Sequence, residues 1–347
     1  MRKKVLLAFD DPGGGLAASS LIERLITENT LELKIYTGNL SENFVSCFKL
    51  QKLNSRISKD EAEKIVDENS PDILVTGTSG GNAEQELRNS AFGKKIKSVV
   101  ILDFWKDYKR RWLYASYPIE KMTDKVCVMD DLAKDEMIKD GFPEKNLIVT
   151  GHPYLDKIFY YSKKIITKNK SEKNNFLFLS QPLHIIGINN YKIHPLKILL
   201  EVLAELARVE TEKISLTIKL HPSEKLSNEL SSLVSEFDCE RLKVKFANEK
   251  VTLKDLIEKS EIIIGYNTIA MFEARALNKR TISLNVVPIK KSLINAMQSA
   301  GMEILDMNKK NILDSLMKRN DKENPSRIYK GGIENCVQVI LSELSLN

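Results

Sequence analysis

Short apolar runs recur along this chain, and each is followed by a polar or glycine-rich turn and then by a helical pattern. Val5–Phe9, Lys97–Leu102 and Thr281–Leu284 are examples of these runs. Runs of this length and apolarity are typical of strands buried on both faces of a parallel sheet. Strands that alternate with helices predict an α/β protein, and a length of 347 residues suits two domains.

Composition narrows the class of protein. Hydrophobic residues make up 42% and charged residues 29%, which is typical of a soluble globular chain. The apolar run near the amino terminus is too short for a signal peptide, and none is long enough to span a membrane. The four cysteines lack metal-binding spacing, so reduced thiols and a cytoplasmic location are expected. The net charge of +6 favours no nucleic acid, but it is compatible with peripheral association at the inner face of the membrane.

Two turns in the second half have the form of a phosphate site. Thr217–Leu220 runs into His221 and Pro222, while Ile262–Ile264 runs into the turn Gly265–Thr268 and a helical pattern. Strands of a parallel sheet bind ligands at their carboxyl ends, and a helix amino terminus there attracts phosphate. We therefore predict a nucleotide pocket. The alternative is that Pro222 only ends the strand.

These motifs resemble those of GT-B glycosyltransferases, and most of all those of enzymes that use CMP-activated sialic or nonulosonic acids. The His-Pro pair, the Asn-Thr turn and the Ser-Gln-Pro-Leu turn at Ser180 carry the resemblance. It implies two Rossmann-like domains whose parallel sheets face a central cleft. It also implies a ribose contact from Glu273. The predicted nucleotide-binding residues are Ser180, Gln181, His221, Pro222, Gly265, Asn267, Thr268 and Glu273.

The first strand ends in Asp10, Asp11, Pro12 and a run of three glycines. The GxGxxG fingerprint is absent, which makes a dinucleotide oxidoreductase a poor fit. The acidic pair is similar to the Asp-Asp-Gly motif that supplies the general base in the resembled sialyltransferases, although Pro12 departs from that motif. The alternative is that Asp11 caps the following helix. Asp103, at the end of a later strand, is a rival base.

Both tryptophans lie in the ten residues that begin at Asp103. Aromatic faces stack on sugars, and arginine binds hydroxyl and carboxylate groups. We therefore predict an acceptor site in which glycines of the first turn allow close approach. The alternative is a loop whose aromatic residues pack on a neighbouring helix. The predicted acceptor-binding residues are Gly13, Gly14, Trp105, Tyr108 and Arg111.

The predicted domain boundaries follow changes in composition. Residues 1–156 form an acceptor domain, 157–175 a polar linker, 176–325 a nucleotide-sugar domain, and 326–347 a helix that packs back towards the first domain. Gly151, His152 and Pro153 resemble the turn that closes the first domain of UDP-GlcNAc 2-epimerases and lipid-A-disaccharide synthase. His152 is accordingly interpreted as a hinge residue.

The predicted function is transfer of a sugar, best described as a sialic or nonulosonic acid from a CMP-sugar, to a glycan or glycolipid acceptor in surface polysaccharide synthesis. Transfer from a CMP-sugar implies an inverted linkage. Because no DxD motif occurs, we expect a metal-independent reaction without a cofactor. One alternative is a UDP-sugar enzyme on the same fold, either UDP-GlcNAc 2-epimerase-like or a polyol-phosphate transferase. Another is a non-catalytic nucleotide-sugar-binding protein.

Overall fold

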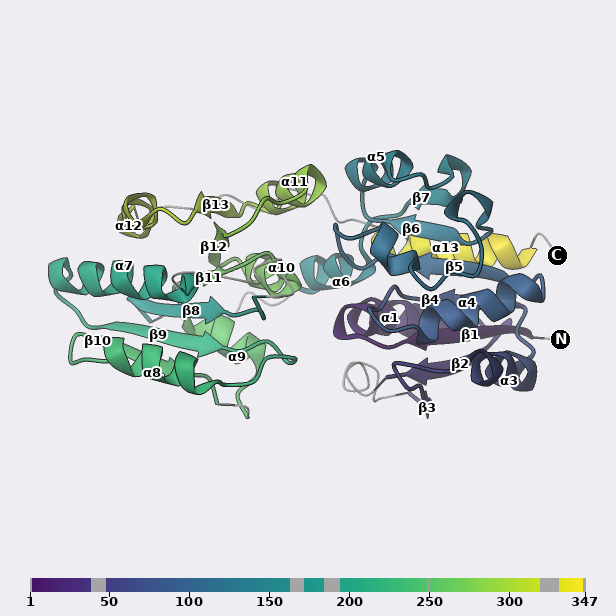
Figure 1. Ribbon diagram of the computed structural model, residues 1–347, viewed down its shortest axis with the longest axis horizontal. Helices are drawn as coiled ribbons and strands as arrows, with labels where there is room; N and C mark the ends of the chain where they lie inside the picture. The colour runs from purple at the N-terminus through teal and green to yellow at the C-terminus, as the bar shows by residue number, and fades with distance from the viewer. Residues whose placement is uncertain are drawn as a thin grey trace. The chain divides into compact units, whose positions relative to one another are not determined.

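The computed structural model describes residues 2–38, 48–162, 172–183, 194–248, 250–318 and 331–345. The chain divides into two compact units, one of Met1–Tyr160 with Ile328–Asn347 and one of Tyr161–Arg327. Each unit contains one parallel sheet with helices on both faces (Figure 1). The predicted fold class, α/β with two Rossmann-like domains, is confirmed.

The sheet of the N-terminal unit has seven parallel strands in the order β3-β2-β1-β4-β5-β6-β7. These strands are β1 (Lys3–Phe9), β2 (Leu31–Thr37), β3 (Leu50–Lys52), β4 (Ile73–Thr76), β5 (Lys97–Ile101), β6 (Lys125–Val128) and β7 (Leu147–Val149). Its helices are α1 (Pro12–Leu25), α3 (Lys59–Asn69), α4 (Ala83–Gly93), α5 (Asp131–Lys139), α6 (Pro153–Ser162) and α13 (Gly332–Ser345).

Alternate residues of the N-terminal strands enter two different cores. Val5 and Leu7 of β1 pack with α1 and α13, whereas Leu6 and Ala8 pack with α3 and α4. This separation follows from the two-residue period of a strand, which sends successive side chains to opposite faces. The result is a three-layer unit in which α13, from the end of the chain, covers the same face as α1.

The sheet of the C-terminal unit has six parallel strands in the order β10-β9-β8-β11-β12-β13. These strands are β8 (Asn175–Leu179), β9 (Ile214–Lys219), β10 (Leu242–Phe246), β11 (Ile262–Gly265), β12 (Arg280–Asn285) and β13 (Glu303–Asp306). Its helices are α7 (Pro195–Val209), α8 (Asn228–Phe237), α9 (Leu253–Lys259), α10 (Ile269–Ala276), α11 (Lys291–Ser299) and α12 (Lys309–Met317). One apolar core joins α7, α8 and α12 to a single face of this sheet.

Both sheets contain a point at which the strand order reverses. In the N-terminal unit it lies between β1 and β4, because α1 packs on one face and α4 on the other. In the C-terminal unit it lies between β8 and β11, since β8 leads to α7 and β11 leads to α10. Loops diverge at such a point and leave a crevice at the carboxyl ends of the strands, which is where open α/β sheets bind ligands.

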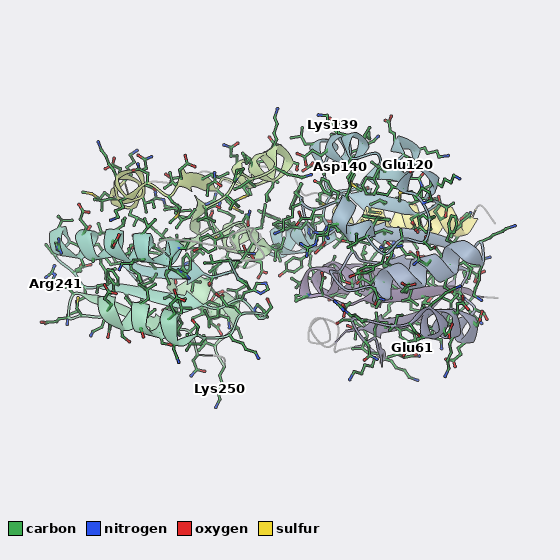
Figure 2. The ribbon with its side chains drawn as sticks, viewed as in Figure 1. Glu61, Glu120, Lys139, Asp140, Arg241 and Lys250 are labelled. Atoms are coloured by element: carbon green, nitrogen blue, oxygen red, sulfur yellow. The ribbon has the colours of Figure 1, made fainter. Side chains whose placement is uncertain are left out.

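The start of the predicted linker differs from the sequence-based expectation. Helix α6 continues to Ser162, so the first residues of the predicted linker are helical, and 163–171 lie outside the described residues. Exposed charged side chains such as Glu61, Lys139 and Arg241 project from the outer surfaces of the helices and loops (Figure 2). Within the described ranges, no helix is long and apolar enough to cross a bilayer.

Candidate functional site

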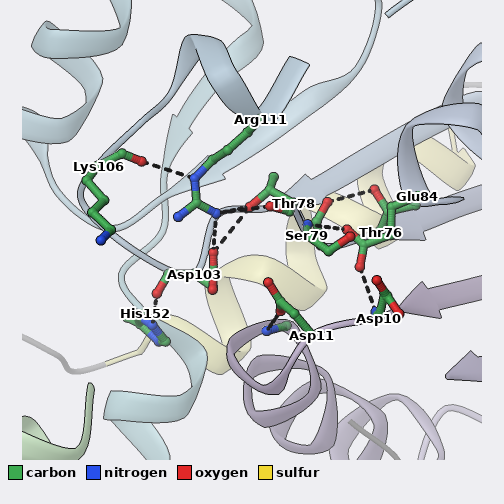
Figure 3. Close-up of polar contacts among 12 residues, drawn as sticks. Asp10, Asp11, Thr76, Thr78, Ser79, Glu84, Asp103, Lys106, Arg111 and His152 are labelled. Atoms are coloured by element: carbon green, nitrogen blue, oxygen red, sulfur yellow. Dashed lines mark hydrogen bonds and ion pairs between the residues drawn. The ribbon is translucent and has the colours of Figure 1, made fainter. Parts of the chain in front are cut away.

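The turn after β1 fixes the position of Asp11. Its side chain accepts a hydrogen bond of 2.7 Å from the N–H of Gly14, so Asp11 is the N-cap of α1. Pro12 follows in the first turn, where proline fits because that backbone needs no N–H donor. Capping of the following helix was the alternative role for Asp11, and Asp11 has this role in the structure. Capping occupies one carboxylate oxygen, Oδ1 (Figure 3).

Asp103 lies after β5, next to Asp11 (Figure 3). Arg111 Nη1 donates to Asp103 Oδ1 at 2.5 Å, and Thr78 Oγ1 donates to the same oxygen at 3.2 Å. The second oxygen, Oδ2, lies so close to Gly13 that a Cβ atom there would overlap it. Gly13 therefore permits Asp103 to reach the start of α1, which is a structural role for a residue predicted to bind an acceptor.

Asp10 is enclosed by other loops than those that contact its neighbour Asp11. Its side chain is 5% exposed, and Ser55 Oγ donates to its Oδ1 at 2.7 Å. Gly38 and Gly81 pack against the same carboxylate, so their lack of a side chain makes room for it. Of the three carboxyl groups predicted as general bases, the structure brings Asp11 and Asp103 together and holds Asp10 in a separate contact with its own loops.

A fourth acid, Glu84 in the first turn of α4, supports this arrangement. It is 1% exposed, and its two oxygens accept the N–H groups of Asp10 and Ser79 at 2.7 and 2.8 Å. It ties the β1 turn to the β4 turn across the strand reversal. Sequence reasoning missed this role, because an acid in the first turn of a helix is common for its effect on the helix dipole alone.

Burial controls the charges of these acids. Burial, followed by the negative charges of Asp103 and Asp10, raises the pKa of Asp11 to about 7, although the Gly14 N–H and Arg111 oppose the rise. Burial and the charge of Asp11 raise the pKa of Glu84 to about 8. Near neutral pH, Asp11 can therefore both give and take a proton, which is the property of a general acid–base catalyst.

The raised pKa values predict that stability falls as pH rises. Between about pH 4 and pH 7 the folded protein holds a proton on Asp11 that the unfolded chain has lost, so deprotonation favours the unfolded state. Asp11→Asn keeps an N-cap and removes the titration. We expect the free energy of unfolding, measured in urea at pH 5 and pH 7.5, to decline less with pH in Asp11→Asn than in the wild type. Equal slopes would contradict the raised pKa.

The aromatic residues of the predicted acceptor site belong to the core. Trp105 and Tyr108 are both 0% exposed. The indole N–H of Trp105 donates to Asp130 at 2.6 Å, and the hydroxyl of Tyr108 donates to Glu136 at 3.1 Å. Neither ring leaves a face on which a sugar could stack, so the alternative of a loop packed on a neighbouring helix describes them. Arg111 is committed to Asp103 and Thr78.

The C-terminal unit holds His221 in a defined orientation. The N–H of Ser223 donates to His221 Nδ1 at 3.1 Å, so Nδ1 of the neutral ring carries no proton and Nε2–H is the donor. Glu224 accepts from the His221 N–H at 3.2 Å and from Ser180 Oγ at 3.0 Å. It thereby links the turns after β8 and β9. Pro222 is exposed beside them.

Buried polar atoms without partners gather where β8 and β11 end. Gln181 Oε1, Tyr266 Oη and Asn267 Oδ1 have no hydrogen-bond partner within the described part of the chain. Unpaired buried polar groups are costly, so such a set indicates a place for a ligand or water.

Thr268 is the N-cap of α10, and Glu273 lies on that helix, partly exposed. Gly265 allows β11 to pack closely against Leu179. Sequence patterns singled out neither Glu224 nor Tyr266.

The described residues contain no group of three His, Cys, Asp or Glu side chains arranged to hold a metal ion. The metal independence expected from the sequence stays a prediction, as does the absence of a cofactor.

Comparison with known proteins relates the fold to a particular group of structures. No protein-family model and no curated protein matches the sequence. The S. aureus MnaA–UDP structure is similar over 99% of this chain and 97% of its own, with a TM-score of 0.71 and 15% identity. UDP-GlcNAc 2-epimerase from Methanocaldococcus jannaschii is similar over 99% of this chain and 100% of its own, with a TM-score of 0.70 and 15% identity. UDP-GlcNAc 2-epimerase from Neisseria meningitidis, bound to UDP-GlcNAc, is similar over 99% of this chain and 100% of its own, with a TM-score of 0.68 and 18% identity.

These likenesses correct the prediction of a CMP-sugar sialyltransferase. Two of these structures are UDP-GlcNAc 2-epimerases and the third is a complex with UDP, and they fit the UDP-sugar alternative better. The prediction was wrong because it relied on a His-Pro pair and a polar turn before a helix. Any phosphate site at the end of a parallel strand favours such residues, so these motifs do not identify the base or the sugar.

Proposed function

We propose that this protein is an enzyme that acts on a UDP-sugar, with UDP-GlcNAc 2-epimerisation as the best-supported reaction. The observation that carries the proposal is the pair of carboxyl groups, Asp11 and Asp103, at the strand reversal of the N-terminal unit. The full-length likeness to UDP-GlcNAc 2-epimerases supports the choice of substrate. We propose a metal-independent reaction, since acid–base chemistry by carboxyl groups needs no metal.

Epimerisation requires groups that can remove and return a proton, and the carboxyl groups of Asp11 and Asp103 are groups of this kind. To invert a carbon, an enzyme must remove its proton and return a proton to the opposite face, so it needs a base, an acid and, where both groups lie on one side, a sugar that turns between the two steps. Two adjacent carboxyl groups divide these roles because their like charges oppose double ionisation. Arg111 forms an ion pair with Asp103, while burial raises the pKa of Asp11 to about 7, so that Asp11 can exchange a proton near neutral pH.

We propose that the nucleotide binds the C-terminal unit, and the charges of the two units support this placement. The crevice beside β1 contains the carboxyl groups of Asp11 and Asp103, which would repel a diphosphate. In the C-terminal unit, His221 presents Nε2–H as a donor, and α10 begins with a polar turn. A donor and a helix amino terminus are suited to a diphosphate.

The proposal predicts selective binding of uridine nucleotides. We would measure the melting temperature with UDP, UDP-GlcNAc and CMP, because a ligand at about a hundred times its Kd adds about 2.7 kcal/mol of stability. UDP and UDP-GlcNAc should raise the melting temperature more than CMP does. A rise with CMP and none with UDP would contradict the proposed substrate class.

His221→Ala should weaken UDP binding by about 1–3 kcal/mol, since it removes a donor to a charged phosphate. Isothermal titration calorimetry provides the measurement. His194→Ala is the matched control, because His194 caps α7 of the same unit. Equal UDP affinities in His221→Ala and the wild type, with both folded, would remove His221 from the site.

A further inference from the structure

His152 contacts Asp103 of the candidate catalytic pair and lies on a different element from either carboxyl group. It follows β7 and directly precedes α6, and its side chain is 1% exposed. Its Nε2 lies 2.8 Å from the main-chain carbonyl oxygen of Asp103 (Figure 3). Because a carbonyl oxygen only accepts, Nε2 carries the proton and donates it. Nδ1 is then unprotonated, and it is buried without a partner within the described residues.

We infer that His152 is a positioning residue for Asp103. Its N–H fixes the Asp103 peptide, and this sets the carboxylate against Gly13 and beside Asp11. The inference rests on the proposed function, because it gives His152 a role through a group of the proposed acid–base pair.

The backbone of His152 is itself held in place, which makes it a rigid support. Gly332 at the start of α13 packs so closely on the main chain of His152 that a Cβ atom there would lie 2.9 Å from it. Asp156, one turn into α6, accepts the N–H groups of Gly331 and Ile333 at 3.2 and 3.1 Å. The end of the chain thus holds His152 from one side, and its ring bonds Asp103 from the other.

The Asp103 segment has an independent anchor on each flank. Before it, the N–H of Leu102 donates to Cys127 O at 3.1 Å, which continues the sheet. After it, the Trp105 indole donates to Asp130, and the ring centroids of Trp105 and His152 lie 5.9 Å apart. Between these anchors, His152 bonds the main-chain carbonyl of Asp103, while Arg111 and Thr78 bond its carboxylate. Loss of the bond from His152 should let the carboxylate move without unfolding the segment.

Two variants separate the hydrogen bond from the shape of the side chain. His152→Gln places an amide N–H where Nε2 lies, whereas His152→Phe fills the space and donates nothing. The charged groups that influence Asp11 are Asp103, Asp10, Glu84 and Arg111. Retreat of Asp103 should therefore lower the pKa of Asp11, and Asp103→Asn gives the reference value for loss of that charge.

The experiment records the titration of Asp11 by carbon-13 NMR of aspartate-labelled protein, together with kcat and KM for UDP-GlcNAc. In His152→Phe we expect the pKa of Asp11 to fall towards that in Asp103→Asn. We also expect kcat to fall about 10- to 100-fold with little change in KM. His152→Gln should stay close to the wild type in both. His152→Leu replaces His152→Phe if the latter does not fold.

Unchanged titration of Asp11 in a folded His152→Phe or His152→Leu protein would overturn the inference. A fall in kcat in His152→Gln equal to that in His152→Phe would also overturn the inference, because the shape of the side chain rather than the hydrogen bond would then be decisive. Absence of turnover in the wild type would contradict the proposed function instead, and the NMR titration would still decide the role of His152.

Discussion

Asp103→Asn is expected to lower kcat for a UDP-sugar by about 10²- to 10⁴-fold, the range that a general acid–base group contributes. Asparagine retains an oxygen that accepts from Arg111 and Thr78, so the local contacts should survive. It cannot take a proton at neutral pH. Affinity for UDP should not change, because the nucleotide is assigned to the C-terminal unit. Steady-state kinetics and calorimetry measure the two effects.

Asp107→Asn is the matched control for this substitution. Asp107 is exposed, lies four residues further along, and has a φ of 56°, a conformation that asparagine tolerates well. The same change of charge there should leave kcat within about twofold of the wild type, since surface changes seldom matter. Equal losses in both variants would show that charge near the loop, and not the Asp103 carboxylate, controls the rate.

Gly13→Ala is expected to separate activity from stability. The new Cβ would overlap Asp103 Oδ2, so the carboxylate must move from its place beside Gly13. Gly13 lies in the first turn of α1, where an alanine restricts the unfolded chain and favours the folded state by about 0.4–1 kcal/mol. We therefore predict an unchanged or raised melting temperature with kcat lowered about 100-fold, the typical cost of misplacing a catalytic group by 1 Å.

Gly80→Ala serves as the control for Gly13→Ala. A Cβ atom at Gly80 would meet nothing within 4 Å, although Gly80 lies in the neighbouring turn after β4. Its activity should match that of the wild type. If Gly13→Ala keeps full activity, the close approach of Asp103 to α1 has no part in catalysis.

The fold could be predicted because its strands are apolar on both faces. Runs such as Val5–Phe9 and Ile262–Ile264 are unambiguous, and the glycine or polar turn after each run marks its end. The edge strands β3 and β13 escaped prediction, since Leu50–Lys52 and Glu303–Asp306 are short and mixed with polar residues. An edge strand pairs on one side only, so it needs no continuous apolar run.

The candidate site could be predicted only in part. Strand ends of a parallel sheet meet at one edge, which is why Asp10, Asp11 and Asp103, each at a strand end, were rival predictions for the general base. The sequence could not distinguish Asp10 from Asp11, because Gly38, Ser55 and Gly81 enclose Asp10 from distant loops. Nor could it show that Trp105 turns into the core towards Asp130. These outcomes depend on tertiary neighbours and leave no local pattern.

The most direct test is incubation of the protein with UDP-GlcNAc in D₂O, followed by proton NMR. We predict that the C2 proton signal of the sugar disappears, that signals of a second UDP-hexosamine arise, and that Asp103→Asn slows both changes. A protein that binds UDP-GlcNAc but leaves its C2 proton and its sugar signals intact would not be a UDP-GlcNAc 2-epimerase.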